Sequence, residues 1–217
     1  MPKNLNGRIE KSEAYMASQA AELIYESSHE LLGFMFGDKG AAVSTLERLF
    51  KYKKGHFSHS FSFVVIQDDA VAGMILGYDN KQLKQQELIG SLLLVLKSPV
   101  RCWWRIITKV GGIVDKYVPE PSDGMYYINN IAVSSDYRGQ GIGQLLINHI
   151  VSYASENKYK GVELDVTDIN QGAIGFYNKL GFREISRTID MPELSKYELP
   201  PLVRMHYIFE EQLSLDN

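Results

Sequence analysis

An arginine and three glycines lie close together in residues 138–143, RGQGIG, between an apolar run and a helical pattern. Glycine lets the backbone turn tightly and places no side chain in the path of a bulky ligand. No residue from 138 to 144 is proline, so each one offers a backbone N–H. N–H groups that converge at a helix N-terminus bind anions, and Arg138 adds a permanent cation. The segment therefore predicts a cradle for a diphosphate group.

The spacing of these glycines differs from that of two common nucleotide-binding loops. A P-loop for nucleoside triphosphates carries Lys-Ser or Lys-Thr after its glycines, and neither pair follows here. The third glycine of a Rossmann fingerprint would stand at Leu146, whereas here Gly139, Gly141 and Gly143 alternate. The remaining alternative is a strand-to-helix turn that binds nothing. An arginine combined with three glycines at a helix start argues against that alternative.

The same segment resembles a known family. An R-G-x-G-x-G turn after an apolar strand is similar to the acetyl-CoA site of the GNAT N-acetyltransferase superfamily. Residues 161–182 resemble the later strand–helix–strand unit of that family, with matching residues at Asp165, Asn170, Ala173, Tyr177, Gly181 and Phe182. The resemblance implies an α/β (α+β) fold, a mixed central β-sheet flanked by helices. It also implies an N-acetyltransferase that moves an acetyl group from acetyl-CoA to a primary amine by direct attack in a ternary complex.

The resemblance assigns two residues to catalysis. Tyr177 matches the motif tyrosine, which implies a proton donor to the thiolate leaving group, since a phenol is neutral at pH 7. The alternative is a core tyrosine on the apolar stripe of its helix. Asp165 lies where some members carry a functional glutamate, so it is a candidate base or the holder of a water. Its alternative is a partner for a nearby N–H or cation.

Further residues are implied to bind the two substrates. Backbone groups of Ile131 and Val133 would pair with the pantetheine arm of the cofactor. Asn170 would act near the cofactor or cap its helix. Tyr127 and Asn129 are candidates for contact with the amine. The diphosphate would be held by Arg138, Gly139, Gly141, Gly143 and Gln144.

Composition narrows the class of protein. With 217 residues, 45% hydrophobic and 23% charged, the chain has the composition of an ordinary soluble protein, and we expect one domain over residues 1–217. The formal net charge of −3 argues against nucleic acid as a partner. Cys102 is the only cysteine, which favours a reducing, cytoplasmic location. We expect no metal site, because His56 and His59 have no second Cys or His pair.

The apolar patterns predict the element order β-αα-ββ-β-α-β-α-ββ, which suits the mixed sheet of the GNAT fold. Strands are expected near Ile9 and at 61–66, 71–77, 125–133, 162–167, 182–189 and 203–209. Asp68 and Asp69 are expected in the turn of a hairpin. Helices are expected over 12–27, 43–50, 142–153 and 170–180.

Residues 81–122 are expected to form a helical insertion between the third and fourth strands. Residues 81–116 contain seven Lys or Arg and two acids, so this stretch carries +5 and the rest of the chain −8. The run from Leu88 to Leu96 is almost wholly apolar and predicts one buried helix. Pro99 suits the first turn of a second helix. That helix has a basic stripe of Arg101, Arg105 and Lys109 and an apolar face of Val100, Trp103, Trp104, Ile107 and Val110.

Two interpretations of the insertion remain open. We favour a helical hairpin packed over the substrate cleft, or a dimer face, since long insertions in compact domains are usually lids or binding elements. The alternative is a membrane contact through residues 88–114, because basic amphipathic helices with tryptophans lie on anionic membranes. No run of ~18 apolar residues predicts a spanning helix.

The acceptor is expected to be a small-molecule or peptide amine, and a homodimer is a further possibility. An alternative function comes from a different class. The chain would then be a catalytically weak acyl-CoA-binding sensor or regulatory module of the same fold. That alternative stays open because the site offers few bases besides Asp165.

Overall fold

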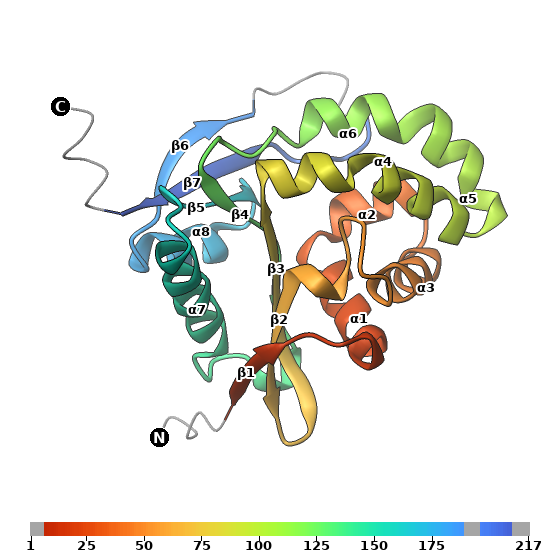
Figure 1. Ribbon diagram of the computed structural model, residues 1–217. Coiled ribbons are helices and arrows are strands. Elements are labelled where there is room, and N and C mark those ends of the chain that lie inside the picture. Colours follow the sequence, from red (N-terminus) through yellow and green to blue (C-terminus); the bar gives the residue numbers. More distant parts are fainter. Residues whose placement is uncertain (1–6, 189–195, 210–217) are drawn as a thin grey trace.

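The computed structural model describes residues 7–188 and 196–209. In this part of the chain, seven strands form one mixed sheet in the order β1-β2-β3-β4-β5-β7-β6 (Figure 1). β4 and β5 are parallel, and the other neighbouring strands are antiparallel. The strands are β1 (Arg8–Lys11), β2 (Ser62–Gln67), β3 (Ala70–Asp79), β4 (Met125–Val133), β5 (Gly161–Thr167), β6 (Arg183–Arg187) and β7 (Leu202–Ile208).

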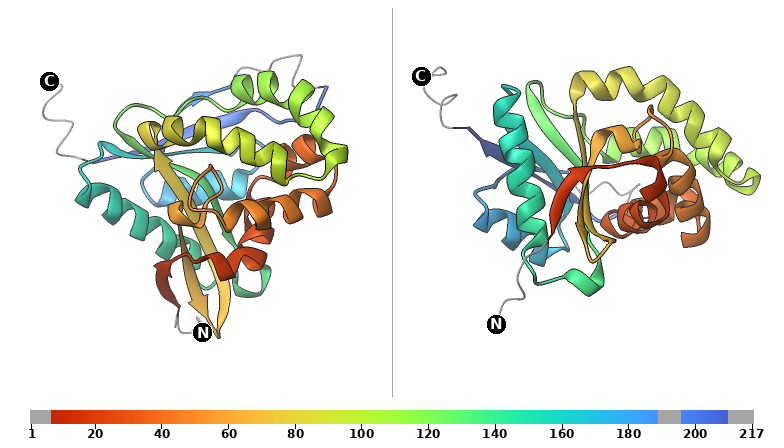
Figure 2. Two further views of the ribbon diagram at one scale, coloured as in Figure 1. Left: turned by 45° about the vertical axis from the view of Figure 1, so that its right-hand side comes forward. Right: turned by 60° about the horizontal axis from the view of Figure 1, so that its bottom comes forward.

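Helices cover both faces of the sheet (Figures 1 and 2). One face carries α7 (Ile142–Glu156) and α8 (Gln171–Lys179). The other face carries α1 (Ala17–Ser27), α2 (His29–Phe36) and α3 (Lys39–Phe50). On that side also lie α4 (Asn80–Lys97), α5 (Val100–Arg105) and α6 (Gly111–Tyr117), with a π-helical turn (Ile106–Val110) between α5 and α6. Short 3₁₀ turns lie at Ala14–Met16, His59–Phe61 and Ser135–Tyr137.

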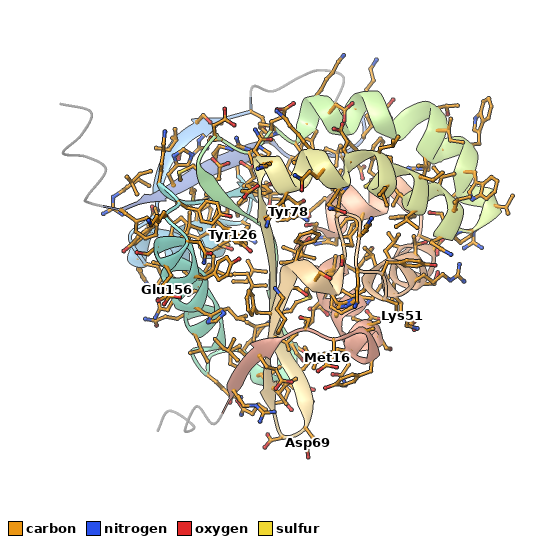
Figure 3. The ribbon with its side chains drawn as sticks, viewed as in Figure 1. Met16, Lys51, Asp69, Tyr78, Tyr126 and Glu156 are labelled. Atoms are coloured by element: carbon orange, nitrogen blue, oxygen red, sulfur yellow. The ribbon has the colours of Figure 1, made fainter. Side chains whose placement is uncertain are left out.

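Two hydrophobic cores result, because alternate side chains of a strand point to opposite faces of the sheet. Val64 and Tyr78 join the core beneath α1–α3, whereas Val65 and Tyr126 join the core beneath α7. Figure 3 shows Tyr78 and Tyr126 on opposite sides of the sheet. This is the mixed sheet flanked by helices that the sequence predicts. No helix of the described residues has both the length and the apolar character needed to cross a membrane.

Most of the predicted elements are confirmed. Asp68 and Asp69 form the two-residue turn between β2 and β3, with φ of 51° and 59°, and Asp69 lies at the hairpin tip in Figure 3. The predicted strand 125–133 is β4. Helix α2 was not predicted, because Gly33 interrupts its apolar pattern. Ile189, at the end of predicted strand 182–189, lies outside the described residues.

The middle strand β4 opens the sheet at its centre. It pairs with β3 along its whole length, but Leu76 faces Asn130 and Gly77 faces Ile128, so Asn129 bulges out of the ladder. Its parallel pairing with β5 ends at Ile128. The two strands therefore separate beyond the bulge, and the β4 edge from 129 to 133 has no neighbouring strand on the β5 side.

The segment 80–117 differs from the prediction. It forms three helices, and the run from Leu88 to Leu96 is not buried: Leu88 is 82% exposed. The opposite side of α4 packs inward, where Gly90 lies against the His56 ring. When apolar residues lie on all sides of a helix, their pattern does not indicate which side packs against the protein, so the sequence could not show which side would be covered.

The predicted basic stripe of the segment is also corrected. Arg105 packs inward: its Nε donates to the Phe34 carbonyl at 2.6 Å, and its guanidinium lies 5.7 Å from the centre of the Phe34 ring. Arg101 does face solvent. The side chains of Lys109 and Val110 lie outside the described ones.

Candidate functional site

A cavity of about 690 Å³ lies where β4 and β5 diverge. Its walls come from the junction of α1 and α2, from β4 and β5, from the turn before α7, from α8, and from the end of α6. All twelve residues that the sequence proposed for the site line this one cavity: Tyr127, Asn129, Ile131, Val133, Arg138, Gly139, Gly141, Gly143, Gln144, Asp165, Asn170 and Tyr177.

The glycine-rich turn has the backbone expected of an anion cradle. Gly139 and Gly141 have φ of 75° and 85°, in the region that favours glycine, and α7 begins directly after Gly141. The backbone N–H groups from Gly139 to Gln144 have no acceptor among the described residues. A Cβ on Gly139 or Gly141 would meet nothing within 4 Å. The turn therefore offers open space beside unpaired N–H groups, which fits a diphosphate.

Arg138 is tied to its surroundings. Its Nε donates to the Val133 carbonyl at 3.1 Å, and its Nη2 forms an ion pair with Glu26 at 3.1 Å. These contacts join the turn to the end of β4 and to α1. The pair is well exposed, so screening by solvent leaves it weak enough to be replaced by a stronger anion.

The open edge of β4 presents backbone groups to the cavity. The Ser134 N–H donates to the Ala72 carbonyl at 2.9 Å, while Val133 faces Gly73. In an antiparallel ladder this turns both polar groups of Val133 away from β3, and the same alternation applies to Ile131. The Val133 carbonyl accepts from Arg138, as above. Ile131 therefore offers an N–H and a carbonyl on this edge, and both side chains pack in the α7 core.

Tyr177 lies on the cavity wall with its ring held in place. The ring packs between Phe176 and Phe182, with centroid distances of 5.4 Å and 5.8 Å. Burial raises the pKa of the Tyr177 phenol well above its usual value, so the group stays protonated at neutral pH. Its hydroxyl has no hydrogen bond within residues 7–188 and 196–209. Tyr177 thus brings a neutral O–H, without a partner among the described residues, to the wall of the cavity from α8.

Asp165 is paired with a buried cation. The Arg204 guanidinium binds both carboxylate oxygens, with Nε at 3.0 Å and Nη2 at 2.8 Å. The Tyr127 hydroxyl donates to the same carboxylate at 3.1 Å. Arg204 also donates to the carbonyls of Pro119 and Glu120. These contacts favour the cation-partner alternative for Asp165, because its oxygens are occupied.

Asn129, Asn170 and Tyr127 have structural contacts as well. Asn129 donates to the Asn130 side chain at 2.5 Å, and Asn130 donates onward to Ser27. Asn170 caps α8, since its Oδ1 accepts from the Ala173 N–H at 3.1 Å. Burial, followed by the charge of Asp165, raises the pKa of Tyr127 far above its usual value.

The structure adds acidic groups that sequence reasoning missed. Glu26 and Glu30 line the cavity together with Asp165. Glu26 pairs with Arg138, and Asp165 pairs with Arg204. Glu30 instead lies 3.4 Å from His29, and this histidine is charged only when it is protonated. Glu30 thus lacks a permanent cation among the described residues. No sequence motif marks it, because it enters the site through the packing of α2.

The wall near Glu30 is largely apolar. Tyr117, at the end of α6, lines the cavity and donates its hydroxyl to the Pro200 carbonyl at 2.8 Å. Burial, and then the charge of Glu30, raises the pKa of Tyr117 well above its usual value. Other lining residues of this end are Leu31, Met35, Phe57, Val118 and Leu202.

Residues 24–182 match the Acetyltransferase (GNAT) family. An uncharacterized N-acetyltransferase of Methanocaldococcus jannaschii is 49% identical over 57 residues, which are 26% of this chain and 25% of the relative. N-acetylaspartate synthetase of Danio rerio is 31% identical over 111 residues, 50% of this chain and 37% of the relative. An N-acetyltransferase from Staphylococcus aureus Mu50 has a similar structure, with a TM-score of 0.74 and 20% identity over 92% of this chain and 100% of that one.

Because the family match covers well over half of its residues, the chain belongs to the acetyltransferase (GNAT) family. Membership classes the matched region as an acyltransferase that takes its acyl group from acetyl-CoA. The likeness to the Staphylococcus aureus structure shows the shared fold. The chain spans only 25% to 37% of the length of the two curated relatives. What those relatives act on is therefore not carried over as a finding.

Proposed function

We propose that the chain is an N-acetyltransferase that moves an acetyl group from acetyl-CoA to a primary amine by direct attack in a ternary complex. The observation that supports it is the single cavity. It joins the free N–H groups of the glycine turn and the open edge of β4 to Tyr177, and it continues to an acidic, apolar-walled end near Glu30. The volume of about 690 Å³ lies within the range of small-molecule and cofactor sites.

The cofactor would be held by the first half of this cavity. The N–H groups of Gly139, Gly141, Gly143 and Gln144, with Arg138, would bind the diphosphate. The pantetheine arm would pair with the N–H and carbonyl of Ile131 and with the N–H of Val133 on the β4 edge, with Asn170 close by. Bound acetyl-CoA supplies an activated acetyl thioester.

The residues of the second half would handle protons and the amine. Tyr177 would hold its phenolic proton ready for the leaving sulfur, because its raised pKa keeps it neutral. Glu30 would attract the acceptor ammonium and favour its approach, being the lining acid without an arginine partner. Asp165 would act through Tyr127 and Arg204 to hold the cavity wall, and Tyr127 and Asn129 would lie beside the amine.

The acceptor class rests on chemistry and on the names of relatives. A lining carboxylate in an apolar wall suits a cationic amine with an apolar body. N-acetylaspartate synthetase of Danio rerio is named for an N-acetylated product, which supports an amine acceptor in general. The proposal covers small-molecule and peptide amines alike. The proposal also takes residues 1–217 as one domain with an insertion at 81–122. It places the protein in the cytoplasm, because a single cysteine, Cys102, fits a reducing compartment.

The acyl-CoA-binding sensor remains the second candidate. The occupied carboxylate of Asp165 supports it, because that residue was the base candidate from the sequence. A sensor would bind acetyl-CoA and release no thiol when amines are added. An enzyme would release coenzyme A in proportion to the amine that is acetylated.

The test combines acetyl-CoA binding with thiol release. We expect acetyl-CoA to raise the melting temperature, and a panel of primary amines to accelerate thiol release. Gly143→Val should abolish the melting shift, because Gly143 lines the cavity at the start of α7 and the added side chain would lie against Phe176 and Val133, which also line it. Gly112→Val is the matched control, since Gly112 lies in α6 and has open space around it. Gly141 is a poorer choice, because its φ of 85° would strain any replacement.

Two results would count against the proposal. If Gly143→Val folds and binds acetyl-CoA like the wild type, the cradle assignment is wrong. If acetyl-CoA binds but no amine in a broad panel causes thiol release, the sensor is the better assignment.

A further inference from the structure

The helical segment 80–117 presents an exposed apolar surface, which we call the outer face. On α4 its members are spaced four apart. Two more, also four apart, lie on α5, and the last follows three residues later in the π-helical turn. Each of them is more than half exposed, with Leu88 at 82% and Trp104 at 76%. The outer face consists of Leu88, Leu92, Leu96, Val100, Trp104 and Ile107.

Such a surface needs an explanation, because large exposed apolar side chains in a series mark contact sites in folded proteins. The opposite sides of the same helices are covered. Gly90 of α4 lies against His56, Cys102 of α5 is buried against the Phe36 carbonyl, and Arg105 packs on Phe34. The segment is thus attached to the molecule by one side, and the apolar series occupies the other.

Cations accompany the apolar series. Lys84 and Lys81 lie on the exposed side of α4, one and two turns before Leu88, and Arg101 follows Val100 with 67% of its side chain exposed. Lys84 and Arg101 each have an exposed acidic neighbour, and such surface pairs are weak. Residues 81–116 carry +5, whereas the rest of the chain carries −8. The segment that carries the outer face is therefore basic, whereas the rest of the chain is acidic, and Lys81, Lys84 and Arg101 are exposed cations of this segment.

The positive charge of the segment distinguishes between two candidate partners of the outer face. A symmetric contact with a second copy would set the same +5 segment against itself, and like charges disfavour that arrangement. An anionic lipid surface has the complementary charge, and tryptophan is suited to the boundary between headgroups and acyl chains. The shape agrees: α4–α6 run along one outer edge of the molecule, with α5 at its far end (Figures 1 and 2).

We propose that the outer face docks peripherally onto a bilayer that contains anionic lipids. The apolar side chains enter the interface, and Lys81, Lys84 and Arg101 bind lipid phosphates and carboxylates. The segment that docks also ends in Tyr117, which lines the cavity. This inference does not depend on the acceptor or on turnover.

The experiment measures co-sedimentation of the full chain with vesicles of phosphatidylglycerol or of phosphatidylcholine. We expect binding to the anionic vesicles that weakens as salt is raised, and much weaker binding to the neutral ones. Trp104→Ser with Ile107→Ser should reduce binding to the anionic vesicles at least about ten-fold. Changing Lys81, Lys84 and Arg101 to Gln should reduce it about 10²-fold and remove most of its salt dependence.

The matched control removes exposed apolar side chains elsewhere. Tyr15→Ser with Ile185→Ser takes away a 75% and a 56% exposed residue from other surfaces and should bind vesicles like the wild type. All variants alter exposed positions, and their melting temperatures verify folding. A second pair, Leu88→Ser with Leu92→Ser, tests the α4 part of the outer face independently.

Three results would overturn the proposal. The first is that the wild type fails to bind anionic vesicles at low salt. The second is that both apolar pairs bind as well as the control. The third is that light scattering finds a dimer which the apolar pairs dissociate, in which case the outer face joins two copies.

Discussion

Replacing Tyr177 with phenylalanine removes one hydroxyl and keeps the ring against Phe176 and Phe182. The side chain is largely buried, and its hydroxyl has no hydrogen-bond partner within the described part of the chain, so no hydrogen bond of the protein is lost. The change in the free energy of unfolding should stay within about 1 kcal/mol. For a chain of this size, that is a shift in melting temperature of no more than ~2–4 °C.

The expected effect on catalysis is much larger. A positioned proton donor contributes ~10²–10⁴-fold to the rate, which corresponds to about 3–5 kcal/mol in the activation free energy. Tyr177→Phe should therefore lower kcat by that factor. Acetyl-CoA affinity, measured by the thermal shift, should change little, because the cradle lies at the start of α7.

The pH dependence gives a second check on Tyr177. Burial raises the pKa of the phenol above its usual value of about 10, so the acid form is present at every lower pH. The wild-type kcat should rise with pH as the acceptor amine loses its proton. It should not fall again below about pH 10. A falling limb near pH 8 would assign the acid to another group.

Tyr127→Phe is the comparison variant for stability, because it also removes one phenolic hydroxyl at the cavity. This hydroxyl donates to the Asp165 carboxylate, so its loss should cost ~1.5–3 kcal/mol of stability. The melting temperature should then fall by ~3–12 °C. If Tyr177→Phe keeps full turnover in a single-turnover assay limited by chemistry, Tyr177 is a core residue and the reasoning fails.

Three further predictions concern stability, each measured by thermal unfolding. Arg204→Met leaves the Asp165 carboxylate buried without its cation and should cost ~3–5 kcal/mol, and adding Asp165→Asn should recover part of it. Burial acts to raise the pKa of Glu163, but hydrogen bonds led by His206 outweigh burial and lower it. The carboxylate therefore stabilises the fold above about pH 4.5, and this contribution is lost as pH falls through the lowered pKa. Glu163→Gln should thus lose less stability than the wild type between pH 7 and pH 3. Asn170→Ala should cost ~1 kcal/mol by uncapping α8, and an unchanged melting temperature would contradict that role.

The central part of the site could be predicted because its signals are local. Glycine spacing in 138–143 reports a turn that needs positive φ, and Gly139 and Gly141 do adopt it. The apolar run in 125–133 placed β4 at the correct residues. These features depend on a few neighbouring residues, so no knowledge of the packing was required.

Other parts of the site depend on contacts between distant segments. Arg204 meets Asp165 only because β5 and β7 are paired in that register, 39 residues apart in the chain. Glu30 reaches the cavity through α2, whose pattern Gly33 interrupts. For α4, the helix was predictable but its exposed side was not, since apolar residues surround it. Sequence patterns report periodicity, whereas these choices follow from tertiary packing.

Arg204 joins the cavity wall to the helical segment that carries the outer face. It holds Asp165 in β5, and it also donates to the carbonyls of Pro119 and Glu120, just beyond the end of α6. One buried cation therefore fixes the end of the helical segment to the strand that bounds the cavity. Tyr117, two residues before Pro119, lines that cavity. Arg204 thus connects the helical segment that carries the outer face to the wall of the cavity. If vesicle binding changes the amine KM of the wild type, Arg204→Met should weaken that change, because the connection is lost while the outer face stays intact.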